Sequence, residues 1–155
     1  MIKKIQHMGL LFPLVIVCSF MLTGCPGPGD RITFDETTQV ATIGSHLCFL
    51  VPESQDYQPT VIAINPRGTP PKSQNFNLKP DIKVADGKLC IPHSFYQFPD
   101  EGQFIVEYIL ASREDKKERR SVVVGVGVSE GHFYNFPLTN MEINRPYTEI
   151  NQKIK

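Results

Sequence analysis

Short segments in which apolar and polar side chains alternate, or in which β-branched residues run together, recur along this 155-residue chain. The clearest are 46–51, 60–64, 103–110 and 121–128; Pro52 ends the first, Asn65-Pro66 the second and Ser129-Glu130-Gly131 the last. This pattern is typical of β-strands with one buried face. No stretch of ten residues carries a convincing helical period. The pattern therefore predicts an all-β protein with seven or eight antiparallel strands.

Turn residues between these segments favour a sandwich. Asp86-Gly87 separates two alternating runs, which is a strong hairpin signal. Asp100-Glu101-Gly102-Gln103-Phe104 resembles the Asp-x-Gly-x-Tyr turn that begins the penultimate strand of immunoglobulin domains, with Phe104 in place of the tyrosine and its hydroxyl bond. We predict an antiparallel β-sandwich, Ig-like in broad architecture, over residues 37–150. A small β-barrel is the alternative.

One predicted hairpin tip is strongly charged. Eight of the nine residues from Ser112 to Arg120 are acidic or basic. A run of this kind is most simply a solvated turn. Its functional interpretation is a patch that steers an acidic partner by electrostatic attraction.

The first 25 residues have a different pattern. Lys3 and Lys4 precede an apolar run from about Leu10 to Met21, which is shorter than the roughly 20 residues that a membrane-spanning helix needs. The run ends in Leu22-Thr23-Gly24-Cys25, which is similar to the lipobox of bacterial lipoproteins. The resemblance implies that a signal peptide, residues 1–24, is removed and that Cys25 carries diacylglycerol and an N-linked acyl chain such as palmitate. An uncleaved anchor and an ordinary cleaved signal are the alternatives.

The residues after Cys25 predict a tether and a destination. Pro26-Gly27-Pro28-Gly29 opposes regular structure, so residues 25–36 are expected to be a flexible tether. Pro26 replaces the Asp that retains lipoproteins at the inner membrane, and in a Gram-negative cell this implies the periplasmic face of the outer membrane. At the other end, residues 151–155 are expected to fray.

Charge and cysteine content bear on which partners the protein could bind and on whether it carries a disulfide. Without residues 1–24 the chain has 14 basic and 16 acidic residues, a net charge of −2, which does not favour nucleic-acid binding. Cys48 and Cys90 remain, and in an oxidising compartment we predict a disulfide between them. Two buried free thiols or a metal site are the alternatives.

The sequence carries no recognised catalytic motif. His46, His93 and His132 have no partners at catalytic or metal-ligand spacing, so we expect no enzyme, metal, cofactor or small-molecule substrate. Arg and aromatic side chains on loops are common anchors of protein interfaces. The candidate partner-binding residues of this kind are Tyr57, Arg67, Phe95, Tyr96 and Phe98. The alternative for Phe95 and Phe98 is that they fold back to cap the sandwich.

Several stretches together resemble a family of short enterobacterial lipoproteins described as type VI secretion immunity proteins of the periplasm. They are Leu22 to Asp30, Asn65-Pro66-Arg67-Gly68, Phe98 to Phe104 and Asn135-Phe136-Pro137-Leu138. The resemblance implies a lipid-anchored protein that binds and neutralises a toxic effector acting in the periplasm. An accessory lipoprotein with a structural or assembly role in an envelope secretion or appendage machine is the alternative function. An envelope hydrolase is disfavoured by the missing catalytic residues.

Overall fold

The computed structural model describes residues 33–115 and 118–146, so the predicted signal peptide, most of the tether and the tail 151–155 lie outside the described residues. The described part contains nine strands rather than seven or eight, because two very short ones also pair. One 3-10 turn, Pro71–Ser73, precedes the fourth strand. The strands are β1 (Val40–Ile43), β2 (His46–Leu50), β3 (Gln58–Pro66), β4 (Phe76–Leu78), β5 (Val84–Ala85), β6 (Lys88–Ile91), β7 (Gly102–Ala111), β8 (Arg119–Ser129) and β9 (His132–Asn135).

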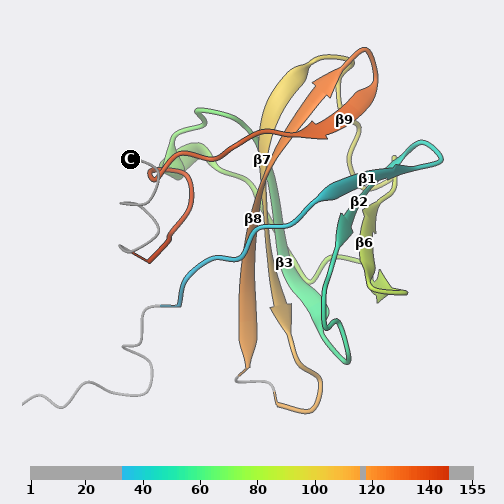
Figure 1. Cartoon of the computed structure of the whole chain (residues 1–155), viewed down its shortest axis with the longest axis vertical. Coiled ribbons are helices and arrows are strands. Elements are labelled where there is room, and N and C mark those ends of the chain that lie inside the picture. The colour runs from blue at the N-terminus through green and yellow to red at the C-terminus, as the bar shows by residue number, and fades with distance from the viewer. Residues whose placement is uncertain (1–32, 116–117, 147–155) are drawn as a thin grey trace, which may run out of the picture. The chain divides into compact units, whose positions relative to one another are not determined.

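The strands form two antiparallel sheets, which confirms the predicted sandwich and excludes the barrel. One sheet has the order β1-β2-β6-β5 and the other β4-β3-β7-β8-β9. Immunoglobulin domains order their strands A-B-E-D in one sheet and C′-C-F-G in the other. The same order is reproduced here, with β9 added beyond the G position (Figure 1). Phe104 lies near the start of β7, which takes the place of the penultimate immunoglobulin strand.

The main core lies between the sheets. On β7 the buried positions alternate strictly, as expected for a strand with one face in the core. Tyr108 is 1% exposed and packs against Phe49 of β2, with 5.4 Å between ring centroids. The side chains that meet it from the two sheets include Leu47, Ile62, Leu89, Val106, Leu110, Val124 and Val126.

A second, smaller cluster covers the opposite face of the five-stranded sheet. The segment after β9 runs across this face, on the side away from β1, β2 and β6 (Figure 1). Phe136, Leu138 and Ile143 pack there on Val123. Gly125 makes this possible, since a Cβ at that position would lie 2.5 Å from the carbonyl oxygen of Phe136. The backbone of the C-terminal segment therefore approaches β8 closely at Gly125.

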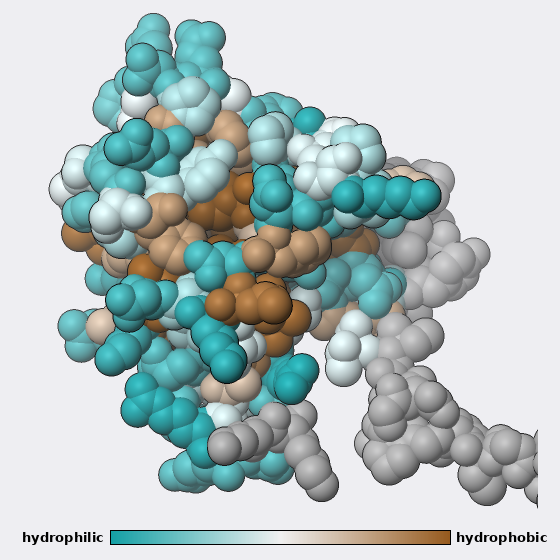
Figure 2. All heavy atoms as spheres, turned by 180° about the vertical axis from the view of Figure 1, so that it is seen from behind, coloured by the Kyte–Doolittle hydropathy of each residue, from teal (hydrophilic) through white to brown (hydrophobic). Residues whose placement is uncertain are grey.

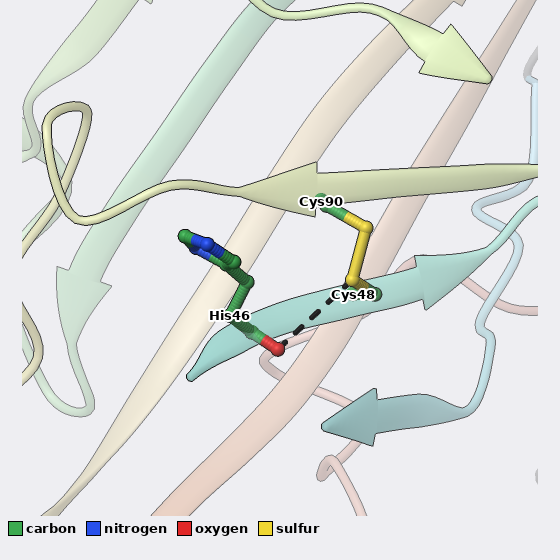
Figure 3. The surroundings of a disulfide bond; sticks show 3 residues. All are labelled: His46, Cys48 and Cys90. Atoms are coloured by element: carbon green, nitrogen blue, oxygen red, sulfur yellow. Dashed lines mark hydrogen bonds between the residues drawn. A yellow bond between two sulfur atoms is a disulfide. The ribbon is translucent and has the colours of Figure 1, made fainter. Parts of the chain in front are cut away.

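The Cys48–Cys90 disulfide is present, as predicted. The two residues lie directly opposite each other in the β2–β6 ladder, with their Cα atoms 4.0 Å apart (Figure 3). Leu47, Phe49 and Leu89 point into the core, so the cysteines alternate onto the outer face of their sheet. Immunoglobulin domains instead join their two sheets through the core. The disulfide in this protein joins two neighbouring strands, β2 and β6, of one sheet.

The N-terminal segment joins the fold earlier than the sequence indicates. The amide of Glu36 donates to the carbonyl of Ser121, and the amide of Val123 donates to the carbonyl of Glu36. The amide of Asp35 donates to the carbonyl of Asn144, and the amide of Asn144 donates to the side-chain carboxylate of Asp35. The predicted tether boundary at residue 36 is therefore wrong, because residues 35 and 36 already belong to the sandwich. Within the described residues no helix is long and apolar enough to cross a membrane.

The charged hairpin tip is exposed at Arg113, Glu114, Asp115, Glu118 and Arg119, and its start is also hydrogen-bonded to the rest of the chain. One carboxylate oxygen of Asp56 accepts from the Ser112 hydroxyl at 2.6 Å and from the Arg113 amide at 2.7 Å. These hydrogen bonds lower the pKa of Asp56. Arg120, which we placed in the tip, lies in β8 and forms an ion pair with Glu36. The patch is thus partly used inside the chain.

Candidate functional site

A groove lined by both apolar and polar groups lies where the β3–β4 edge meets the loop after β6. Its volume is about 290 Å³. Ile62, Ile64 and Pro66 form its floor from β3. Asn75, Phe76 and Asn77 line it from the edge strand, and Phe95 and Tyr96 line it from the loop after β6.

Strand β4 forms the outer rim of the groove. Phe76 is 50% exposed and Leu78 is 70% exposed, although both belong to a paired strand. Figure 2 shows one face of the molecule on which apolar side chains gather centrally and hydrophilic side chains surround them. Contiguous exposed apolar side chains are a common mark of a protein-interaction surface.

A buried asparagine fixes the start of β4. Asn65 is only 5% exposed. Its side-chain oxygen accepts from the amide of Asn75 at 2.8 Å, and its side-chain nitrogen donates to the carbonyl of Asn75 at 3.3 Å. A side chain that satisfies both backbone groups of one residue holds that residue in a single position. The rim is therefore an ordered part of the sandwich.

The aromatic loop supplies both a cap and a wall. Phe98 packs edge-on against Phe104 and Phe133, each at 5.3 Å between ring centroids, so it caps the core. Tyr96 contacts Phe98 at 4.7 Å and also lines the groove, where burial raises the pKa of its hydroxyl. Phe95 is partly buried and lines the same groove. Of the predicted anchors, Phe95 and Tyr96 thus reach a candidate site, while Phe98 supports them from behind.

Tyr57 has a different role from the predicted one. It is 6% exposed and belongs to the main core. The guanidinium of Arg120 covers its ring at 5.3 Å from the centroid. A hydrogen bond with Glu118, together with burial, raises the pKa of its hydroxyl to about 12. The prediction of Tyr57 as a partner anchor is corrected, because its ring already has its partners inside the chain.

Arg67 is also engaged inside the chain. Its Nε and Nη2 atoms donate to the two carboxylate oxygens of Glu142 at 2.6 and 3.0 Å. Nη1 donates to Gln103, and the guanidinium lies 4.5 Å from the centroid of the Phe136 ring. A bidentate pair of this geometry is a strong, directional contact. Arg67 therefore holds the C-terminal segment against the sheet. The prediction of Arg67 as a partner anchor is corrected, because its guanidinium already has its partners inside the chain.

The Arg67–Glu142 pair predicts an acid-sensitive contribution to stability. The pKa of Glu142 falls from 4.5 to about 2, mainly because its carboxylate accepts hydrogen bonds from Arg67. A carboxylate whose pKa is lower in the folded state stabilises the fold above about pH 5, and this contribution is lost as the pH falls through 2. In urea unfolding at pH 7 and pH 3, Glu142→Gln should therefore be destabilised most at pH 7 and differ less from wild type at pH 3.

Glu101→Gln, at an exposed position, is the matched control. It should follow wild type at both pH values. An equal loss of stability for Glu142→Gln at pH 7 and pH 3 would contradict the ion-pair interpretation.

The three histidines predicted to lack ligand-spaced partners lie in two places. The rings of His46 and His93 lie 6.1 Å apart between centroids, and His132 lies separately at the start of β9. Across residues 33–115 and 118–146, no three His, Cys, Asp or Glu side chains are grouped so that they could hold a metal ion. The groove, which combines the aromatic rings of Phe95 and Tyr96 with the polar Asn75 and Asn77, is the candidate functional site.

Comparison with known proteins gives one result. Residues 35–131 match a family described as a domain of unknown function, DUF7480. The chain belongs to this family. The region shared with DUF7480 runs from the N-terminal segment through β8 and contains the whole groove, while β9 and the segment that carries Glu142 lie beyond it. No curated protein and no solved structure matches the chain.

Sequence reasoning missed the residues that open the groove to solvent. Phe76 and Leu78 are not among the predicted partner-binding residues. The available signal was that two large apolar residues lie in a three-residue strand close to Pro71 and Pro80.

Proposed function

We propose that this protein is a lipid-anchored immunity protein of the periplasm, which binds a toxic secreted effector through the groove and neutralises it. The observation that carries the proposal is that the edge strand β4 exposes two large apolar side chains, Phe76 and Leu78, and that the groove bordered by this strand holds the half-buried rings of Phe95 and Tyr96. Aromatic side chains in partly desolvated pockets are the usual anchors of protein interfaces. Occlusion of the effector requires a binding surface and no reacting group.

The lipobox-like sequence supports the location. A protein held by acyl chains on Cys25 at the periplasmic face of the outer membrane would stay in the compartment that the effector enters. Two or more chains give stable anchoring, whereas one chain binds only marginally. The tether would leave the sandwich free to present its groove.

The test uses the chain from residue 25 onward, with Cys25→Ser so that it carries no lipid. It is immobilised, exposed to the secreted proteins of its own strain, and its bound partners are identified by mass spectrometry. We expect one secreted effector in stoichiometric amount, whose toxic activity is lost in the complex. Phe76→Ala should weaken binding at least about 30-fold, the effect of removing an interface hot spot.

Met141→Ala is the matched control, because Met141 is 96% exposed and borders a different pocket on the C-terminal segment. It should bind like wild type. Recovery of envelope-machine components in place of an effector would favour the accessory-lipoprotein function. Hydrolysis of peptidoglycan or phospholipid by the purified protein would contradict both.

A further inference from the structure

We propose that the effector is recognised by strand addition: an extended segment of the effector, apolar at alternate positions and flanked by acidic residues, pairs with the free edge of β4. This inference rests on the proposed function and specifies how the groove would bind. It also has a test of its own that does not need the effector.

The backbone of β4 provides a free edge. The amide of Lys79 donates to the carbonyl of Thr60, and Asn77 lies opposite Ile62 in the same ladder. Because the backbone groups of successive residues in a strand point to opposite sides, residues 77 and 79 face β3 while Phe76 and Leu78 face away. In the described part of the chain, β4 is the last strand of its sheet and pairs only with β3. The outward amides and carbonyls of Phe76 and Leu78 are therefore available to another strand.

The side chains suit an incoming strand on both faces. Asn77 lies opposite Ile62, whose side chain is in the main core, so this face of β4 borders the groove. Phe76 and Leu78 lie on the other face, where they are largely exposed. An added strand would place alternate side chains in the groove and against these two residues. In this mode of recognition the backbone provides affinity and the pockets provide specificity.

The charges around β4 select the partner. Between Thr69 and Lys83 the chain has three basic residues, Lys72, Lys79 and Lys83, and one acidic residue, Asp81. All four are exposed. A net charge of +2 beside the edge attracts a segment with acidic flanks. The same charge disfavours a second copy of this chain, whose β4 would bring like charges together.

The strand's ends limit the length of the added ladder. Asn75 is held by Asn65, and Lys79 has a φ of +59°, after which Pro80 cannot donate. The edge thus offers two outward-facing residues in a fixed register. A short edge of this kind restricts non-specific sheet extension while permitting a specific contact.

Leu78→Pro tests strand addition because it removes the outward amide and leaves the amides of Asn77 and Lys79 for the ladder with β3. Leu78→Ala is the matched control, since it shortens the side chain and keeps the amide. The probe is the peptide acetyl-Glu-Val-Thr-Val-Thr-Val-Glu-amide, and its twin with Lys at both ends is the charge control. Binding is followed by amide NMR shifts of the ¹⁵N-labelled Cys25→Ser chain.

We expect the acidic peptide to shift the Phe76 and Leu78 amide signals and the lysine twin to bind more weakly. Leu78→Pro should bind the acidic peptide about tenfold more weakly than Leu78→Ala, which corresponds to one lost hydrogen bond. Equal binding by the two variants, or no shift at Phe76 and Leu78 with the acidic peptide, would overturn strand addition. Near-ultraviolet circular dichroism spectra and urea-unfolding curves, compared with those of wild type, establish that both variants are folded.

The effector separates this inference from the proposed function. If wild type and Leu78→Pro neutralise the effector equally, strand addition is wrong and the immunity function stands. If wild type neutralises no effector of its strain, the immunity function is wrong, and the peptide result alone decides whether β4 accepts a strand.

Discussion

Removing the disulfide with Cys48→Ala and Cys90→Ala is expected to lower the free energy of unfolding by about 4 kcal/mol. The bridge joins residues 42 positions apart, and a closed loop of that length restricts the unfolded chain by roughly this amount in the chain-entropy model. The loop contains β3, β4 and β5, so the strands that build the groove lie inside it. The two partners are already neighbours in a ladder, and the native sheet does not need to rearrange to form the bond.

Urea unfolding with and without a reductant measures this effect. Wild type should lose stability when reduced, and the double variant should be indifferent to the reductant. A difference of less than about 1 kcal/mol between wild type and the double variant would contradict the account, since that lies well below the range typical of native disulfides.

Gly125→Ala is expected to destabilise the protein by about 2–3 kcal/mol, the upper part of the range for overpacking. The new Cβ would meet the backbone oxygen of Phe136 at 2.5 Å, and the Phe136 amide donates to the carbonyl of Gly125 at 3.1 Å. The C-terminal segment must therefore move away from the sheet. This movement would also disturb the contact between Arg67 and the Phe136 ring.

Gly127→Ala is the matched control two residues along β8. Its Cβ would overlap the ring of Tyr134, but this ring is the far end of a side chain that is 43% exposed, so it can swing outward. We expect its stability to stay within about 1 kcal/mol of wild type, because Ala is also the better strand residue. Equal destabilisation by the two substitutions, in urea unfolding, would contradict the close packing of the C-terminal segment at Gly125.

The sandwich could be predicted because its determinants are local. Alternation over β7, the β-branched run of β8 and the Asp86-Gly87 turn each act over a few residues, and all three occur where expected. The disulfide could be predicted because only Cys48 and Cys90 follow Cys25, the predicted lipid-anchored cysteine. The strand count was too low because β5 is only two residues long.

The candidate site could be predicted only in part because its partners are distant in sequence. Glu142 lies 75 residues from Arg67, and nothing near Arg67 indicates that its guanidinium is already paired. Tyr57 lies beside a polar loop, which suggests exposure. Its ring is nevertheless covered by Arg120 of β8, which is distant in sequence. Phe95 and Tyr96 were recognised as aromatic loop residues, while their proximity to β4 depends on the three-dimensional arrangement.

The most direct test of the account is the survival of cells that receive the effector in the periplasm. A bacterium lacking this protein is made to export each secreted effector of the source strain, with or without the full-length protein. The account predicts that the protein restores survival against one effector, that Phe76→Ala loses this protection, and that the protein has no effect on viability without an effector. Failure to protect against any effector of the strain would contradict the proposed function.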